Sequence, residues 1–418
     1  MGTLKFSLKM LRLDFKKCFF YGLSLVISTS IIFVFFNYID NIHIGNGFDE
    51  KNGFTQVLSL IIIIIACANA CFANSFFISK KTNELAIASM SGASVFALTG
   101  YILVQNFVIM LLSIPLGFGL GYIFNHFFNQ YVYSILNVQA NTFYISSEAL
   151  VLSIIVVLTE IVALTLVNAG YAYRSEIKTL LTQDQAMNKK SNKPIKTPVI
   201  IYWIIYLMPI FLFFKISLEP MSFVVLSMLG TFGISGLLKI GISKIIMHRQ
   251  KSHLTSPRSL IAYGNLSYTI KTTGLLMTII IISIILLIGF MISFIDQPKD
   301  LMIIILSYGI IIFLMSTSIL YKTVLEMTSR TKLYQSLYKL GYLKKDLRAI
   351  MKKEMILLYS IILFFPSSYC ILMLLRFIIA GVVEANFALL VILAYIIPIS
   401  LTAFIAYFIY KRTIISKL

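Results

Sequence analysis

Residues 79–121, SKKTNELAIASMSGASVFALTGYILVQNFVIMLLSIPLGFGLG, decide how the rest of the chain is interpreted. They begin with lysines, continue as a short stretch of small helix-forming residues and break at Gly92. A long apolar run follows, of the length that a helix needs to cross a hydrocarbon core of roughly 30 Å. A second stretch of the same design lies 249 positions later, where Gly341 matches Gly92 and Glu354 matches Gln105. We interpret both stretches as cytoplasmic elbows that lead into membrane helices.

The composition places the chain in the membrane. Hydrophobic residues make up 59% of it, charged residues only 12%, and the mean hydropathy is +0.92. A soluble domain carries about 25% charged residues. Because the apolar residues come in runs of about 18 to 25, the sequence predicts a polytopic helical membrane protein. The alternating pattern of an outer-membrane barrel is absent.

The formal net charge of +19 has a topological meaning. Lysines and arginines gather in alternate loops between the apolar runs, as they do in cytoplasmic loops, so both termini are expected in the cytoplasm. This placement argues against nucleic acid as a partner and predicts an attraction to anionic lipid headgroups. About ten spans satisfy the rule, over residues 18–38, 56–78, 99–123, 149–171, 199–214, 221–246, 273–294, 301–320, 355–379 and 387–410.

The predicted fold is an all-α polytopic membrane protein with about ten transmembrane helices. Residues 1–181 form a first four-helix repeat that is preceded by an amphipathic N-terminal helix. Residues 182–250 contain a polar, lysine-rich linker and a two-helix hairpin. Residues 251–418 form a second four-helix repeat. Both repeats start on the same side of the membrane, so the repeat is parallel rather than inverted.

No catalytic set or metal site is recognisable in the sequence. The chain lacks a GxxxxGK[ST] phosphate loop, an HExxH motif and a GxSxG motif. Cys67 and Cys71 lie one helical turn apart without further ligands nearby, which favours small buried thiols over a metal site. We therefore expect a non-catalytic membrane subunit that binds no cofactor itself and depends on a partner for any energy it uses.

The first elbow (Lys80–Ser94) and the second elbow (Thr331–Lys345) are candidate docking surfaces for a cytoplasmic partner. A short interfacial helix ended by a glycine can press into a partner groove, although a plain connector has the same pattern. In the first elbow, the apolar side chains are expected to lean toward the membrane and the polar ones toward water or the partner. The candidate residues are Lys81, Glu84, Leu85, Ile87, Met90 and Gly92 in the first elbow, and Leu337, Leu340, Gly341 and Lys344 in the second.

The first elbow and the helix after it resemble the FtsX/MacB-type ABC permease family. The matching elements are Lys81, Glu84-Leu85-Ala86, Met90-Ser91-Gly92-Ala93-Ser94, Gln105, the glycines at 117, 119 and 121, and Tyr173–Lys178. The second copy matches more loosely, with Leu333 in place of Glu84. The ten-span layout is similar to that of the bacitracin-export (Bce-type) permeases. Only Ile295–Asp300, IDQPKD, stands here in place of their large extracellular domain.

The resemblance implies a permease subunit in a bacterial cell membrane. A separate ABC ATPase, as a dimer that binds ATP and Mg, would dock on the elbows. Its hydrolysis would drive export or extraction of an amphipathic peptide, antimicrobial peptide or lipid-like substrate. Two alternatives remain open: a transporter or channel that is driven by an ion gradient and uses Glu160, and a non-transporting mechanotransmission or signalling subunit.

Five polar residues inside predicted spans are further candidates. Glu160 lies within the fourth span, where a charge is costly and therefore a functional suspect. The structural alternative is a protonated or hydrogen-bonded Glu160 that packs against a neighbouring helix. Asn69 and Asn74 are expected to hydrogen-bond between helices. Gln105 and Glu354 lie near the cytoplasmic starts of their spans, where a headgroup-level position explains them without a function.

Overall fold

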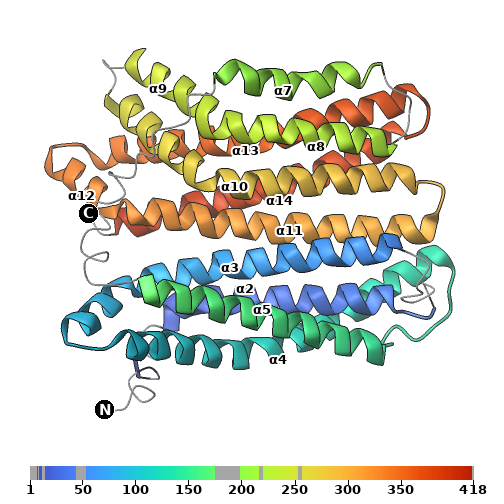
Figure 1. Ribbon diagram of the computed structural model, residues 1–418, viewed down its shortest axis with the longest axis horizontal. Helices are drawn as coiled ribbons and strands as arrows, with labels where there is room; N and C mark the ends of the chain where they lie inside the picture. The colour runs from blue at the N-terminus through green and yellow to red at the C-terminus, as the bar shows by residue number, and fades with distance from the viewer. Residues whose placement is uncertain are drawn as a thin grey trace. The chain divides into compact units, whose positions relative to one another are not determined.

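The computed structural model describes residues 7, 9–11, 15–43, 53–174, 198–215, 220–252 and 257–416, and these residues contain helices and turns but no strand. The chain forms two compact units, Met1–Pro194 and Ile195–Leu418. The two-helix hairpin that the sequence predicted thus lies in the second unit. Figure 1 shows the ribbon with its helices labelled. The N-terminal amphipathic helix and the interdomain linker fall largely outside the described residues.

The first unit is organised around its first long helix. It contains α2 (Phe15–Ile39), α3 (Gly53–Met90), α4 (Val95–Leu136) and α5 (Ser147–Arg174). Helix α2 packs against each of the other three. In α2, 72% of the long apolar stretch is buried, whereas only 28% of the corresponding stretch is buried in α4 and in α5. The apolar faces that α4 and α5 leave open are those that lipid would cover.

The second unit has α10 at its centre. Its elements are α7 (Val199–Leu212), α8 (Pro220–Gly236), the π-helical turn η1 (Leu237–Gly241), α9 (Ile242–Ser252), α10 (Pro257–Ser293), α11 (Pro298–Ser329), α12 (Thr331–Lys339), α13 (Lys344–Ile379) and α14 (Ala385–Ile415). Helix α10 contacts α8, α9, α11 and α13, and α14 packs on α11 and α13. The hairpin α7–α8 is also tied to α13, because the Tyr369 hydroxyl donates to the Tyr206 carbonyl over 2.5 Å.

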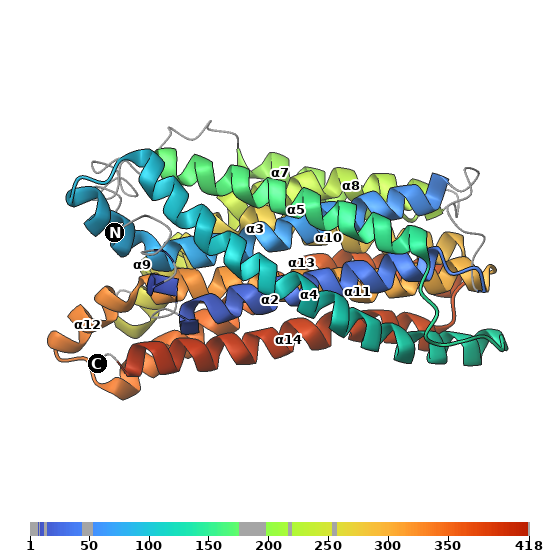
Figure 2. The ribbon, with the colours of Figure 1, turned by 90° about the horizontal axis from the view of Figure 1, so that it is seen from below.

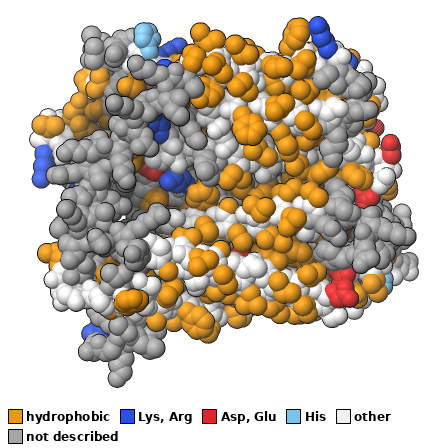
Figure 3. All heavy atoms as spheres, viewed as in Figure 1, with side chains coloured by type: hydrophobic (Ala, Val, Ile, Leu, Met, Phe, Trp, Pro, Cys, Tyr) orange, Lys and Arg blue, Asp and Glu red, His pale blue; other side chains and the backbone are white. Residues whose placement is uncertain are grey.

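Eight helices among the described residues are long and apolar enough to cross a membrane: α2, α3, α4, α5, α10, α11, α13 and α14. The protein is therefore an all-α, multi-pass membrane protein. The apolar helices Val199–Leu212 and Ser222–Gly236 are shorter, so the count of ten spans stays a prediction. Leu111, Leu112 and Leu116 on α4 illustrate the exposed apolar surface, at 57%, 58% and 63% exposure. Figure 3 shows hydrophobic side chains along the visible sides of the described helices.

Two helix ends differ from the sequence-based expectation. Helix α3 continues unbroken to Met90, so the first elbow has no separate helix, because residues 82–90 contain no glycine or proline to stop it. In the second elbow, by contrast, Arg330 leaves the helical region (φ −87°, ψ 10°) and α12 is a distinct helix. Helix α4 also runs to Leu136, well past the predicted end of its span at Ile123.

Two glycines of α4 let it approach α2 closely. A Cβ atom at Gly117 would lie 2.6 Å from the Cβ of Thr29 and 2.9 Å from the carbonyl oxygen of Val26. At Gly121 it would lie 3.0 Å from the ring of Phe33. Gly119, between them, has no such neighbour within 4 Å. The glycine spacing therefore serves packing on one face of α4.

We expect Gly117→Ala to destabilise the protein by about 1–3 kcal/mol, because the new methyl group overlaps the α2 backbone and a branched side chain that cannot swing away. Gly119→Ala is the matched control and should be neutral or slightly stabilising, since alanine favours a helix. Thermal unfolding of both purified variants in one detergent measures the difference. Equal midpoints would contradict the close approach of α2 and α4.

Candidate functional site

The second elbow is a rigid turn closed by a glycine. Gly341 has φ +96°, a conformation that side chains with a Cβ rarely adopt. Its N–H donates to the Tyr338 carbonyl over 3.0 Å, and the Tyr342 N–H donates to the Leu337 carbonyl over 3.2 Å. This is the Schellman arrangement that ends a helix with defined geometry. The turn therefore sets the direction in which α13 leaves α12.

The outer face of this elbow combines exposed apolar and basic side chains. Leu340 and Leu343 are 76% and 67% exposed. The ammonium group of Lys344 lies 5.7 Å from the ring centre of Tyr338, a distance at which a cation and the face of an aromatic ring attract each other. We call this face the second-elbow surface; its exposed residues are Lys332, Leu333, Tyr338, Lys339, Leu340, Leu343, Lys344 and Lys345. Such a mixture suits contact with another protein.

A buried ion pair lies beneath the second-elbow surface. Arg330, between α11 and α12, pairs with Glu354 of α13, whose side chain is completely buried. The other guanidinium nitrogen of Arg330 donates to the Asn265 carbonyl over 3.1 Å and to the Thr269 hydroxyl over 2.6 Å, both on α10. The Asn265 amide in turn donates to Glu354 over 3.2 Å. Each charge thus has a partner and further hydrogen bonds, as burial requires.

Two tyrosines extend this network to the end of the chain. The Tyr410 hydroxyl of α14 donates to the Tyr334 hydroxyl of α12 over 2.7 Å. Tyr334 is the buried residue of α12, and burial, together with the nearby negative Glu354, raises the pKa of Tyr334. Its hydroxyl therefore stays protonated at neutral pH. We call Arg330, Glu354, Asn265, Thr269, Tyr334 and Tyr410 the elbow network; it joins α10, α12, α13 and α14 to the turn between α11 and α12 at one end of the second unit.

The first elbow has the same backbone turn with a different interior. Gly92 has φ +88°, and the Ser94 hydroxyl caps α4 by accepting from the Ala97 N–H over 3.3 Å. Leu85 is buried with Leu98, Tyr101 and Ile102. The turn is thus held by apolar packing as well as by its cap.

Two expectations about the first elbow are corrected by the structure. Lys81 was expected to face water or a partner but is 1% exposed within the unbroken α3. Leu85 was expected to lean toward the membrane but is buried, whereas Ile87 and Met90 are 69% and 70% exposed and their contact with the membrane stays a prediction. Gln105 of α4 is buried, and its amide donates to the Ser7 carbonyl over 3.1 Å. The Glu84 side chain lies outside the described residues.

The two elbows correspond position by position. The offset of 249 that relates Gly92 to Gly341 also relates Lys81 to Arg330 and Gln105 to Glu354. Lys81, Gln105 and Glu354 are buried, and the Arg330 side chain is 10% exposed. The sequence analysis singled out Lys81, Gln105 and Glu354 but missed Arg330, although applying the same offset to Lys81 finds it. Asn265, Thr269 and Tyr410 gave no sequence signal, because they meet the elbow only through folding.

The polar residues inside the first unit join its helices. The Ser28 hydroxyl of α2 donates to Glu160 of α5 over 2.8 Å. The Asn74 amide of α3 donates to Asn168 of α5 over 2.6 Å, and the Asn106 amide of α4 donates to Asn74 over 3.3 Å. Asn69 is buried as well. These contacts fit the predicted role of interhelical hydrogen bonds.

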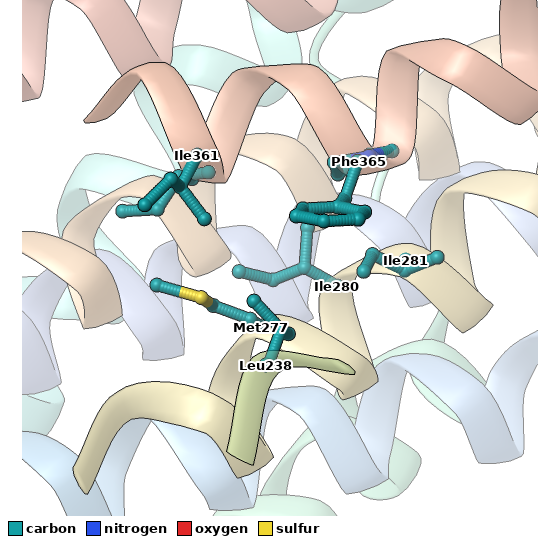
Figure 4. Close-up of a pocket in the computed structure, with 8 residues that line it drawn as sticks. Leu238, Met277, Ile280, Ile281, Ile361 and Phe365 are labelled. Atoms are coloured by element: carbon teal, nitrogen blue, oxygen red, sulfur yellow. The ribbon is translucent and has the colours of Figure 1, made fainter. Parts of the chain in front are cut away.

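Two other candidates, a metal site and a small apolar pocket, are less suited to binding. No group of three metal-ligating side chains occurs among the described residues. A pocket between η1, α10 and α13, lined by apolar residues such as Leu238, Met277 and Phe365, holds only about 10 Å³ (Figure 4). That is roughly the space of one water molecule, and an apolar lining gives a water no partners. The second-elbow surface and the elbow network thus remain the strongest candidate site.

Comparison of the chain with models of protein families finds no match, and comparison with curated proteins finds none either. The function must therefore be argued from the elbows and their surroundings.

We expect Arg330→Met and Glu354→Gln each to destabilise the protein by about 3–5 kcal/mol, because each strips a buried group of its charged partner. The double variant should lose less than the sum of the two single losses. Thermal unfolding in detergent of the unaltered protein, the two single variants and the double variant measures this coupling. The control is Arg348→Met, which removes an exposed cation one turn into α13. If Arg330→Met and Glu354→Gln lost no more stability than this control, the buried pair would be contradicted.

Proposed function

We propose that this chain is the non-catalytic membrane subunit of a bacterial ABC system of the FtsX/MacB type. A separate cytoplasmic ATPase, as a dimer that binds ATP and Mg, docks on the two elbows. Its cycle drives export or extraction of an amphipathic peptide, antimicrobial peptide or lipid-like substrate. The protein lies in the cell membrane with both termini in the cytoplasm, in contact with membrane lipids.

The paired elbows are the observation that carries this proposal. Both have a positive-φ glycine, and both place a basic residue that is at most 10% exposed and a buried polar residue at matching positions. A plain interfacial connector has no need for this repeated construction. A partner with two equivalent subunits would need it, because each subunit must find a docking surface of the same geometry.

Helix packing within each unit supports the two parallel repeats. In the first unit α2 packs on α3 and α4, and α5 packs on α3 and α4. In the second unit α10 packs on α11 and α13, and α14 packs on α11 and α13. With α2 matched to α10, α3 to α11, α4 to α13 and α5 to α14, these four pairs agree, whereas the α2–α5 contact has no counterpart of similar extent between α10 and α14. Helices α7–α9 then form the predicted insertion.

The charges of the second unit support a cytoplasmic position for the second elbow. The start of α10, the end of α11, α12, the start of α13 and the end of α14 lie at one end of this unit (Figure 1). The lysines and arginines there are Arg258, Lys322, Arg330, Lys332, Lys339, Lys344, Lys345, Arg348, Lys352, Lys353, Lys411 and Arg412. Acidic residues at the opposite end include Asp296, Asp300 and Glu384. This asymmetry is the one that the positive-inside rule describes.

The elbow network suggests how a push on the second elbow travels. A force on α12 acts on Arg330 and Tyr334, which hold α10 and α13 on one side and α14 on the other. Because buried ion pairs do not stretch without losing their partners, α12 would move these helices rather than slide past them. A transporter and a signalling subunit would both use such a linkage. Whether a substrate is transported distinguishes the two.

The double variant Leu340→Glu/Leu343→Glu should abolish co-purification of an ATPase with the tagged protein from its native membrane. Both side chains are exposed, so the change adds negative charge to the second-elbow surface without disturbing the fold. Ile42→Glu is the matched control, since Ile42 is 68% exposed just beyond the end of α2.

Immunoblotting for the tagged chain and mass spectrometry of the eluate give the readout. Failure of any ATPase to accompany the unaltered protein in mild detergent would overturn the proposal. Retention of the ATPase by the double variant would remove the second elbow from the docking site while leaving the ABC assignment to be tested on the first.

A second candidate function is transport driven by an ion gradient, favoured by the buried Glu160–Ser28 hydrogen bond within the span of α5. On this hypothesis Glu160→Gln abolishes gradient-dependent uptake or efflux in proteoliposomes. Glu148→Gln, at the exposed start of the same helix, should leave it unchanged. Under the ABC proposal we expect Glu160→Gln to retain ATP-driven activity, because glutamine can still accept the Ser28 hydroxyl.

A further inference from the structure

The far end of α4 projects beyond the helices beside it. Residues 137–146, which follow α4, fold back along it, since Asn129 donates to the Thr142 carbonyl over 3.1 Å and Asn125 to the Tyr144 carbonyl over 3.2 Å. Helix α5 begins only after this return, at Ser147. The last turns of α4 and the returning loop therefore stand past the start of α5 (Figure 2).

A hollow of about 430 Å³ lies in this projection. Its lining is mostly neutral and polar; the polar side chains are Gln130, Tyr133, Ser134, Asn137, Gln139 and Thr142. The remaining two lining residues are a valine and an alanine. This volume falls within the range of small-molecule sites, about 300–1,000 Å³.

The walls of the hollow are fixed by hydrogen bonds. Asn137 ends α4 in the left-handed conformation (φ 53°), and its N–H and that of Val138 both donate to the Tyr133 carbonyl. At the end of α2, Asn41 donates its side-chain amide to the Tyr133 hydroxyl over 2.9 Å. The site is thus held from both the loop and α2, which lowers the entropy that a ligand must remove on binding.

One buried group in the lining of the hollow has unused hydrogen-bonding capacity. Tyr133 is 4% exposed, and its hydroxyl accepts from Asn41, which leaves the hydroxyl proton available to donate. Tyr133 is one of the residues that line the hollow, so a ligand there can accept this proton.

The chemistry of the lining selects the class of ligand. Residues 124–147 contain no lysine or arginine, so an anion would find no counter-charge. None of the lining side chains is a carboxylate, so a cation would also find no counter-charge in the lining. A peptide that binds by strand addition needs a sheet edge, and the described residues contain no strand. Amides and hydroxyls that both donate and accept match the hydroxyl groups of a sugar.

We propose that this hollow is a carbohydrate site that takes one or two sugar rings. The ligand approaches from the side of the membrane opposite the first elbow, because the hollow lies at the end of α4 and the first elbow at its beginning. Gln130, Gln139 and Asn137 bind the ring hydroxyls from the rim. The Tyr133 hydroxyl donates to the ligand from the base of the hollow. The proposal concerns a site separate from the elbows and does not depend on the ATPase.

The test uses the full-length chain alone, in a detergent without a sugar headgroup. Saturation-transfer NMR with N,N′-diacetylchitobiose and with maltose as probes should show transfer to at least one of them. In the double variant Gln130→Ala/Gln139→Ala we expect affinity to fall at least tenfold. Both glutamines are exposed, so this change should leave the fold and its thermal midpoint intact.

The matched control is Gln297→Ala, which removes an exposed glutamine from the α10–α11 turn of the second unit and should leave binding unchanged. Absence of transfer to both sugars overturns the proposal. So does transfer that the double variant retains in full, or that the control loses equally. Binding of a neutral tripeptide at the same glutamines, without sugar binding, would assign the hollow to peptide instead.

Discussion

The ion pair between Arg330 and Glu354 is the constraint on which the second unit depends. Two charges that are removed from water must pair with each other, and their remaining donors and acceptors must be hydrogen-bonded. Otherwise the folded state loses several kcal/mol of stability. Meeting that requirement fixes the end of α11 against the start of α13, and Asn265 and Thr269 bring α10 to the same place. The geometry of the second-elbow surface follows from it, since α12 begins directly after Arg330.

The two elbows show that one backbone turn can be stabilised in different ways. Both need a glycine where φ is positive, and neither glycine has a neighbour that a Cβ would strike, so conformation alone explains them. Beneath the turn, the second elbow has the charged pair and two tyrosines, whereas the first has Leu85 packed among apolar residues of α4. A leucine at position 85 and a tyrosine at the matching position 334 mark this divergence. The second elbow is thus held by an ion pair and hydrogen bonds, whereas the first combines apolar packing with the Ser94 cap and the Gln105–Ser7 hydrogen bond.

The sequence was sufficient for the features that depend on local chemistry. Long apolar runs predicted membrane helices, and the glycines at 92 and 341 predicted the two turns, because only these patterns satisfy the backbone in lipid and at positive φ. It was insufficient wherever burial depends on distant partners. Lys81 looked like a surface cation, yet it is 1% exposed within the unbroken α3. Asn265 and Tyr410 are ordinary residues in sequence, and their roles appear only when α10 and α14 reach Glu354.

Helix α4 connects the two functional regions proposed for the first unit. At 42 residues it extends about 63 Å at 1.5 Å per residue, with the first elbow at its start and the polar hollow at its end. Gly117 and Gly121 press it against α2 along the middle, and Asn41 at the end of α2 holds the Tyr133 hydroxyl. A displacement of the first elbow along α4 would therefore carry α2 with it or open these contacts. Because α2 and Asn41 form part of the hollow's support, either response changes the shape of the hollow, and by reciprocity a ligand there changes the cost of moving the elbow.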